Sequence, residues 1–168
     1  MNQPAGHHLA EFNIGVLRYD WDDPRVADFA NNEPRVNALA ERAEGFVWRL
    51  SSEEMERAQL DPDGPLGGNP RTASTLSVWT DAASLEQFVW NTVHRNFYAR
   101  RAEWYDATDS HRLVMWWVPE GTRPSAADGM ARLARLEAEG PSEHAFGWSE
   151  LKDARLWKTR GCGDAEAA

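Results

Sequence analysis

The stretch TLSVWTDAASLEQFVWNTVHRNFYARRAEWYD, residues 75–106, joins a strand pattern directly to a long helix pattern. TLSVWT is short, apolar and rich in β-branched residues, as strands are. Asp81 then stands at the position that a helix N-cap occupies, ahead of a long amphipathic run. We therefore predict a strand over 75–80 and one continuous helix from there to about Asp106.

Two stripes run side by side along this predicted helix, at about 100° of rotation per residue. The apolar stripe, which must face the sheet, comprises Leu85, Val89, Val93, Phe97 and Trp104. The neighbouring stripe combines aromatic rings with hydrogen-bonding groups and comprises Trp90, His94, Tyr98, Arg101 and Tyr105. Either this second stripe only widens the core, or it forms one wall of a pocket. In a pocket, His94 would be an acid, a base or a cofactor ligand, since its charge changes near neutral pH.

Further strand and helix patterns flank this stretch on both sides. HLAEFNIGVL alternates strictly, with one apolar side, as a half-buried strand does. Asp23 marks a helix N-terminus, and Pro34 marks a break or kink in that helix. Ser125 and Asp128 form a capping-box pattern, and Gly140 ends that helix. The further strands are predicted over 8–17, 45–50 and 112–118, and the further helices over about 24–43 and 125–140.

The order of these elements begins β-α-β-β-α-β, which is the ferredoxin-like split unit. We predict an α+β fold with a four-stranded antiparallel sheet, helices on one face and an extra C-terminal helix. A length of 168 residues suits one domain, predicted over 8–148, with a C-terminal extension or tail over 149–168. Residues 51–73 are predicted to be a long loop that acts as a gate: a polar, helix-tolerant piece, SSEEMERAQL, is followed by DPDGPLGGNPR, which is too rich in Pro and Gly for regular structure.

The charge and the cysteine content narrow the class of partner. Eighteen basic and 27 acidic residues give a net charge of -9, which repels phosphate backbones and anionic lipid surfaces. We therefore expect no nucleic acid partner, and no membrane partner either, because no apolar stretch approaches the roughly 20 residues of a membrane span. Cys162 has no second cysteine to pair with, and a cytoplasmic location is expected. The histidines lack metal-ligand spacing, so no metal site is predicted.

Nine Trp residues are the main peculiarity of the composition. Trp fills cores, but it also lines ligand pockets and interfaces. The strand positions opposite the apolar sets are polar or aromatic: Glu11, Asn13, Arg49, Ser77 and Trp79. If they share one face of the sheet, that face is too polar for a core and too aromatic for plain exposure to solvent. It would line a cavity or form an interface with a partner.

Several segments together resemble one bacterial family, the domain of unknown function DUF3291. They include NIGVL, GFVWRL, the H-x-x-x-Y-x-R-R-x-E-W run from His94 and the WWVP-x-G-x-x-P segment from Trp116. The resemblance covers roughly residues 8–148, and these motifs are specific in combination.

The resemblance implies the dimeric α/β barrel superfamily, in which two ferredoxin-like subunits press their sheets together. A sheet with helices on one face leaves its other apolar face bare, so a homodimer through that face is expected. Members include cofactor-free and haem-degrading monooxygenases, muconolactone isomerases and stress-induced proteins, and the fold does not choose among them. The haem-degrading branch uses an Asn, a Trp and an axial His, and Asn13, Trp79 and His94 occur here in that order.

Two classes of function follow from these patterns. The first is a small-molecule enzyme, monooxygenase-like or isomerase-like, with a hydrophobic or aromatic substrate held between the sheet and the second helix. His94 would move the proton, while Asn13 and either Arg101 or Arg49 would orient oxygens or stabilise an enolate. The predicted substrate-binding residues are Trp48, Arg49, Trp79, Trp90, Tyr98 and Trp116. This enzyme needs no cofactor; haem bound through His94 is the alternative. The second class is a non-catalytic dimeric module that binds a ligand or responds to stress.

Overall fold

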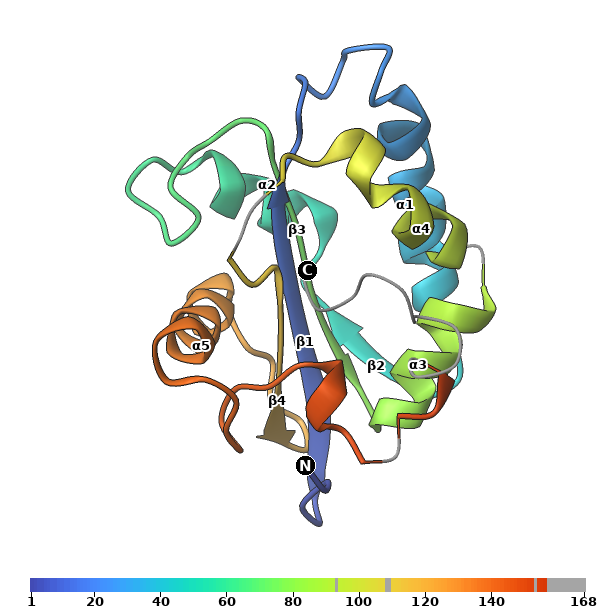
Figure 1. Ribbon diagram of the computed structural model, residues 1–168, viewed down its shortest axis with the longest axis vertical. Coiled ribbons are helices and arrows are strands. Elements are labelled where there is room, and N and C mark those ends of the chain that lie inside the picture. Colours follow the sequence, from blue (N-terminus) through green and yellow to red (C-terminus); the bar gives the residue numbers. More distant parts are fainter. Residues whose placement is uncertain (93, 108–109, 153, 157–168) are drawn as a thin grey trace.

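A four-stranded antiparallel sheet forms the centre of the molecule (Figure 1). The computed structural model describes residues 1–92, 94–107, 110–152 and 154–156. The strands follow the spatial order β2-β3-β1-β4, and every neighbouring pair is antiparallel. Their bounds are β1 His7–Val16, β2 Phe46–Arg49, β3 Thr72–Trp79 and β4 Leu113–Pro119. The predicted α+β class and the four-stranded antiparallel sheet are confirmed.

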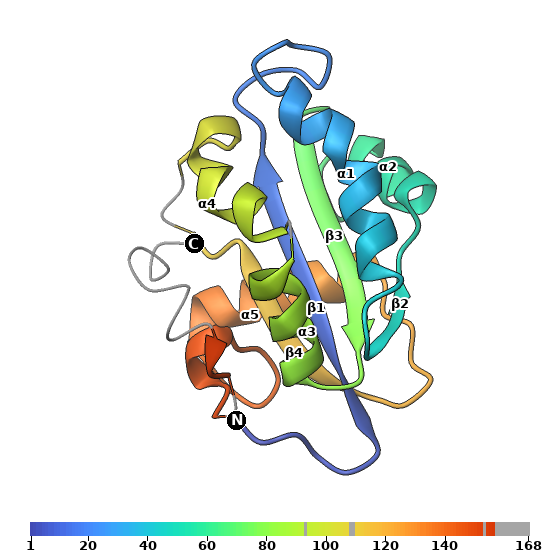
Figure 2. The same ribbon diagram turned by 90° about the vertical axis from the view of Figure 1, so that its right-hand side faces the viewer.

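Helices cover both faces of this sheet, so the molecule has three layers. One face carries α1 (Ala27–Ala40), α3 (Ala82–Asn91) and α4 (His94–Trp104), which lie in front of β1 and β3 in Figure 2. The opposite face carries α2 (Ser52–Leu60) and α5 (Ala126–Glu139). Within the described ranges, no helix is both long enough and apolar enough to cross a membrane.

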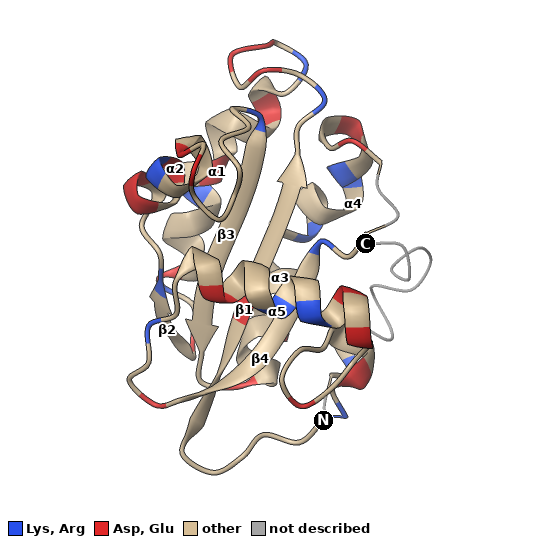
Figure 3. Ribbon diagram, turned by 90° about the vertical axis from the view of Figure 1, so that its left-hand side faces the viewer, with Lys and Arg blue, Asp and Glu red and all other residues tan. Residues whose placement is uncertain are grey.

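The face predicted to be bare is instead buried within the single chain. Phe12, Val78 and Trp116 on this face are at most 2% exposed, because α5 and α2 pack over them (Figure 3). A Cβ at Gly129 of α5 would lie 2.6 Å from Cγ of Phe12, so this approach of helix to sheet requires glycine. The extra C-terminal helix α5 therefore covers the apolar face of the sheet that we expected a partner subunit to cover. The homodimer stays a prediction, but the argument from a bare apolar sheet face no longer supports it, because that face is buried within the chain.

The continuous helix predicted as far as Asp106 is wrong, because the chain leaves helical geometry at Thr92, where ψ is -176°. The Thr92 hydroxyl donates to the carbonyl of Phe88 at 2.7 Å and accepts from the N–H of His94 at 3.2 Å. The Thr92 side chain thus bonds a backbone carbonyl at the end of α3 and a backbone N–H at the start of α4. Asn and Thr side chains compete with helical hydrogen bonds in this way, and Asn91–Thr92 is the local signal for the break.

Three smaller differences from the sequence prediction concern loops and ends. Pro34 does not break α1, which runs through it, and α1 starts after Val26 with no side-chain cap. The helix-tolerant piece of the predicted 51–73 loop forms α2, which has a complete Ser51–Glu54 capping box. In the C-terminal extension, Leu151 is buried in the same core as the sheet. Residues 157–168, including Cys162, lie outside the described residues.

Candidate functional site

A pocket of about 760 Å³ is lined by the Glu11–Asn13 face of the sheet and by helices α1, α3 and α4, and its lining also includes residues of α2 from the opposite face. This volume is within the range of small-molecule sites. Several aromatic rings line the pocket, among them Trp21, Phe29, Trp79, Phe88, Phe97 and Trp104. Phe29 and Trp104 pack with ring centroids 5.6 Å apart, and Trp79 stacks on Phe88 at 5.3 Å. These contacts hold the walls in place, so the pocket suits a flat apolar molecule.

A polar network crosses the floor of this pocket, on β1 and β3. The antiparallel register sets Glu11 opposite Ser77 and Asn13 opposite Thr75. The Asn13 Nδ2 donates to Glu11 Oε1 at 2.8 Å and to Thr75 Oγ1 at 2.7 Å. The Ser77 hydroxyl donates to Glu11 Oε2 at 3.0 Å and accepts from the Trp79 indole N–H at 3.0 Å. Both amide hydrogens of Asn13 are therefore used in holding the floor.

Glu11 is the buried acid of this network, with 6% of its surface exposed. Burial raises its pKa to about 7, although the hydrogen bonds from Asn13 and Ser77 act in the opposite direction. Within the described part of the chain, no cation contributes to this shift and no ion pair forms at Glu11. A carboxyl group that changes charge near neutral pH can accept or donate a proton under physiological conditions.

His94 lies on the pocket wall as the first residue of α4. Its ring centroid is 5.2 Å from that of Phe88, and its Nδ1 is enclosed with no hydrogen-bond partner among the described residues. Burial lowers the pKa of His94 to about 4, although a hydrogen bond with the Val89 backbone acts in the opposite direction, so the imidazole is neutral at neutral pH. Burial therefore brings the pKa of Glu11 close to neutral pH and takes the pKa of His94 away from it.

The end of the pocket near α4 carries positive charge and tyrosine rings. The Arg101 guanidinium lies 4.4 Å from the ring centroid of Tyr98 and donates to the Tyr98 carbonyl at 3.0 Å. Burial raises the pKa of Tyr98, so its phenol stays protonated. Arg112 also lines the pocket, and its guanidinium lies 5.9 Å from the ring centroid of Tyr105. This end supplies guanidinium donors and stacking surfaces together.

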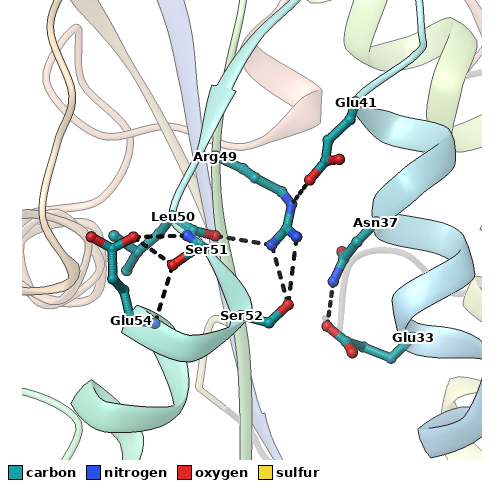
Figure 4. Close-up of polar contacts among 8 residues, drawn as sticks. All are labelled: Glu33, Asn37, Glu41, Arg49, Leu50, Ser51, Ser52 and Glu54. Atoms are coloured by element: carbon teal, nitrogen blue, oxygen red, sulfur yellow. Dashed lines mark hydrogen bonds and ion pairs between the residues drawn. The ribbon is translucent and has the colours of Figure 1, made fainter.

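Arg49 lies at the rim, where it joins three elements (Figure 4). Its Nε donates at 2.7 Å to Oε1 of Glu41, the C-cap of α1, and its Nη1 donates to the Leu50 carbonyl at 3.0 Å. Weaker contacts reach the hydroxyl of Ser52 at the start of α2. The ion pair across the rim therefore connects the edge strand β2 to the helix that covers the pocket. Within the predicted 51–73 gate, Ser52 and Gln59 of α2 line the same pocket.

The pocket brings together six of the nine predicted site residues: Asn13, Arg49, Trp79, His94, Tyr98 and Arg101. The other three do not line it. Trp48 and Trp116 point to the opposite face, into the core beneath α2 and α5, because side chains alternate along a strand. Trp90 is buried behind Tyr98, with ring centroids 4.9 Å apart.

Sequence reasoning placed Glu11 on this wall but gave it no chemical role. The available signal was an acid in the middle of HLAEFNIGVL, an otherwise apolar strand. Arg112 was missed altogether, since it lies just before β4 and outside every motif. Across the described ranges, no group of three His, Cys, Asp or Glu residues is placed to hold a metal ion.

The fold and the pocket define an α+β protein with an aromatic small-molecule cavity and a buried acid on its floor. The profile of the domain of unknown function DUF3291 matches residues 8–162, and the chain belongs to this family. A search among curated proteins finds no match. A solved protein of unknown function from Nitrosomonas europaea is similar at 14% identity, with a TM-score of 0.42, over 74% of this chain and 99% of that one.

Proposed function

We propose that the protein is a small-molecule enzyme in which Glu11 takes a proton from a hydrophobic, aromatic substrate. The observation that carries this proposal is a carboxyl group buried on the floor of an aromatic pocket, with no cation beside it. A buried acid without a counter-charge lowers the stability of the fold, and proteins keep such groups where chemistry needs them. Its pKa of about 7 suits a general base at neutral pH.

The reaction that fits this site begins with a C–H bond next to a carbonyl group. Glu11 would accept the proton on a carboxylate oxygen, and the electron pair of the C–H bond would move to the carbonyl oxygen as an enolate. Return of that proton to another carbon completes an isomerisation. In the monooxygenase-like course the enolate carbon of a CH₂ group bonds to dioxygen; the O–O bond then breaks, one oxygen stays on the carbon as a carbonyl and the other leaves as water, so that the substrate supplies all four electrons. Asn13 acts here as a positioning residue, because both of its amide hydrogens already serve Glu11 and Thr75.

We also propose the ferredoxin-like arrangement and the dimeric α/β barrel superfamily for this chain. The strand order supports the first, since β3 lies between β1 and β2, and β1 lies between β3 and β4. Each helical connection therefore skips one strand, as in two interleaved β-α-β units. The homodimer is tested by light scattering on the purified protein, where a mass near that of one chain would reject it.

Proton exchange into a simple probe tests the proposed base. The probe is 1-phenylbutane-1,3-dione in D₂O, and the readout is loss of its C2–H signal by NMR. We expect the wild-type protein to accelerate exchange above buffer, and Glu11→Gln to reduce that acceleration by about 100-fold or more. Glu143→Gln is the matched control, because this glutamate is exposed. Wild-type exchange no faster than buffer, or full activity in Glu11→Gln, would reject the proposal. Binding without exchange would favour the non-catalytic ligand-binding module.

Haem binding through His94 is a second candidate. It is favoured by the position of His94 on the pocket wall and by its neutral imidazole, which is the form that binds a metal. Haem, when bound, would supply iron-centred oxidation chemistry. Titration with hemin tests this candidate: a Soret band that appears with the wild type and is lost in His94→Ala supports it. An unchanged spectrum of hemin in the presence of the wild type rejects it.

A further inference from the structure

We infer that the ligand of this pocket carries a carboxylate and that Arg112 binds it. The inference deepens the proposed function, on which it rests for the location of the ligand. It names the class of substrate as an aromatic carboxylate, with the ring among the aromatic walls and the anionic group at the α4 end of the pocket.

The backbone fixes Arg112 beside the pocket floor. Its carbonyl accepts the N–H of Ile14 at 2.9 Å, which attaches the residue to β1 next to Asn13. From there the side chain reaches the Tyr105 ring, and its guanidinium donates to the Asp106 carbonyl. The side chain is half-buried and lines the pocket. The guanidinium is therefore held at the wall and does not extend freely into solvent.

The charge of Arg112 is not matched by an ion pair within the described part of the chain. Five other arginines do pair with carboxylates: Arg25, Arg49, Arg57, Arg100 and Arg135. Burial lowers the pKa of Arg112, Tyr105 acts in the opposite direction, and the positive charge of Arg101 adds a smaller lowering effect that Asp106 opposes. Arg101 and Arg112 thus both line the pocket with half-buried side chains.

A carboxylate is the ligand group that this end fits best. Burying a guanidinium without an anion is unfavourable, and a bound anion removes that cost. The planar guanidinium forms two parallel hydrogen bonds with a carboxylate, so a flat anionic group is preferred over a single oxygen. The Tyr105 ring packs so closely on Gly15 that a Cβ at Gly15 would lie 2.5 Å from Tyr105 Cδ1. This fixed ring lies beside the Arg112 guanidinium and limits where a bound carboxylate can sit.

A pair of isosteric probes tests the inference by calorimetric titration. 2-Naphthoate carries the carboxylate, whereas 2-naphthamide has the same shape and no charge. We expect the wild type to bind 2-naphthoate about ten-fold or more tightly than 2-naphthamide, since a hydrogen bond to a charged group contributes on the order of 1.5–3 kcal/mol. Arg112→Gln should lose most of this preference and keep its affinity for the amide, and Arg112→Lys should keep part of it.

Arg57→Gln is the matched control, because Arg57 is exposed on α2 and its ion pair is on the surface. This variant should keep the full preference, and circular dichroism should show that all variants are folded. Equal affinity of the wild type for the two probes, or a full preference in Arg112→Gln, would overturn the inference while leaving Glu11 as the proposed base. Absence of binding by either probe would overturn it as well. Failure of the exchange experiment alone would leave it standing.

Discussion

Replacing Glu11 with Gln should make the protein more stable at alkaline pH and leave it little changed at acidic pH. The pKa of Glu11 is raised from 4.5 to about 7 by burial, so folding favours the protonated carboxyl group. The stabilising effect of protonated Glu11 is fully present below pH 4.5 and is lost as the pH rises through about 7. The difference between the two pKa values corresponds to about 3 kcal/mol, which is the stability that the wild type loses across this window.

Gln keeps the shape of the side chain and cannot ionise. Its carbonyl can accept from Asn13 as Glu11 Oε1 does, and its amide can donate to the Ser77 hydroxyl. The advantage of Glu11→Gln over the wild type should therefore be small at pH of about 4.5, rise between about pH 4.5 and 7, and level off near 3 kcal/mol.

Urea unfolding followed by Trp fluorescence, repeated at a series of pH values, measures this advantage. Glu143→Gln removes an exposed carboxylate instead, and its stability relative to the wild type should stay nearly flat over the same range. Infrared spectroscopy gives an independent measurement, because a protonated carboxyl band that disappears in Glu11→Gln reports the group directly. A constant stability difference across the pH series would show that Glu11 is ionised like an exposed acid, and the general-base argument would fail with it.

Two further predictions concern packing and capping. Gly15→Ala should destabilise the fold by about 1–3 kcal/mol, because its Cβ would overlap the Tyr105 ring. In Gly147→Ala the new Cβ would meet only ordinary contact, at 3.5 Å, so urea unfolding should separate the two variants clearly. Ser125→Ala removes the side-chain acceptor for the Asp128 N–H at the start of α5 and should cost about 1 kcal/mol. An unchanged urea midpoint in Ser125→Ala would mean that the capping box contributes nothing to stability.

The strands could be predicted from sequence because each carries a strong local pattern. Alternation in HLAEFNIGVL predicted which residues share a face, and the structure places Glu11 and Asn13 together over the pocket. The side on which each Trp lies was harder to predict. Trp48 lies beside Arg49, and a register shift between Phe46 and Trp48 in the β2–β3 pairing disturbs simple alternation there.

Features that depend on tertiary packing could not be predicted in the same way. The amphipathic pattern of α5 predicted a helix, but nothing local specified that it would cover the sheet face expected for a partner. The pKa of Glu11 likewise depends on burial by helices far away in the sequence. The break at Thr92 did have a local signal, but the angular pattern through His94 and Tyr98 fits a continuous helix just as well.

Because of the break at Thr92, α3 anchors the layer to the sheet and α4 mainly lines the pocket. The buried residues of α3 are Ala82, Leu85, Glu86, Phe88, Val89 and Trp90, whereas Trp104 is the buried residue of α4. Substitutions at the exposed positions of α4 therefore leave the anchoring of α3 intact, whereas His94 and Tyr98 also pack on Phe88 and Trp90 of α3. We expect a deep mutational scan to find the exposed positions of α4 more permissive than the buried positions of α3.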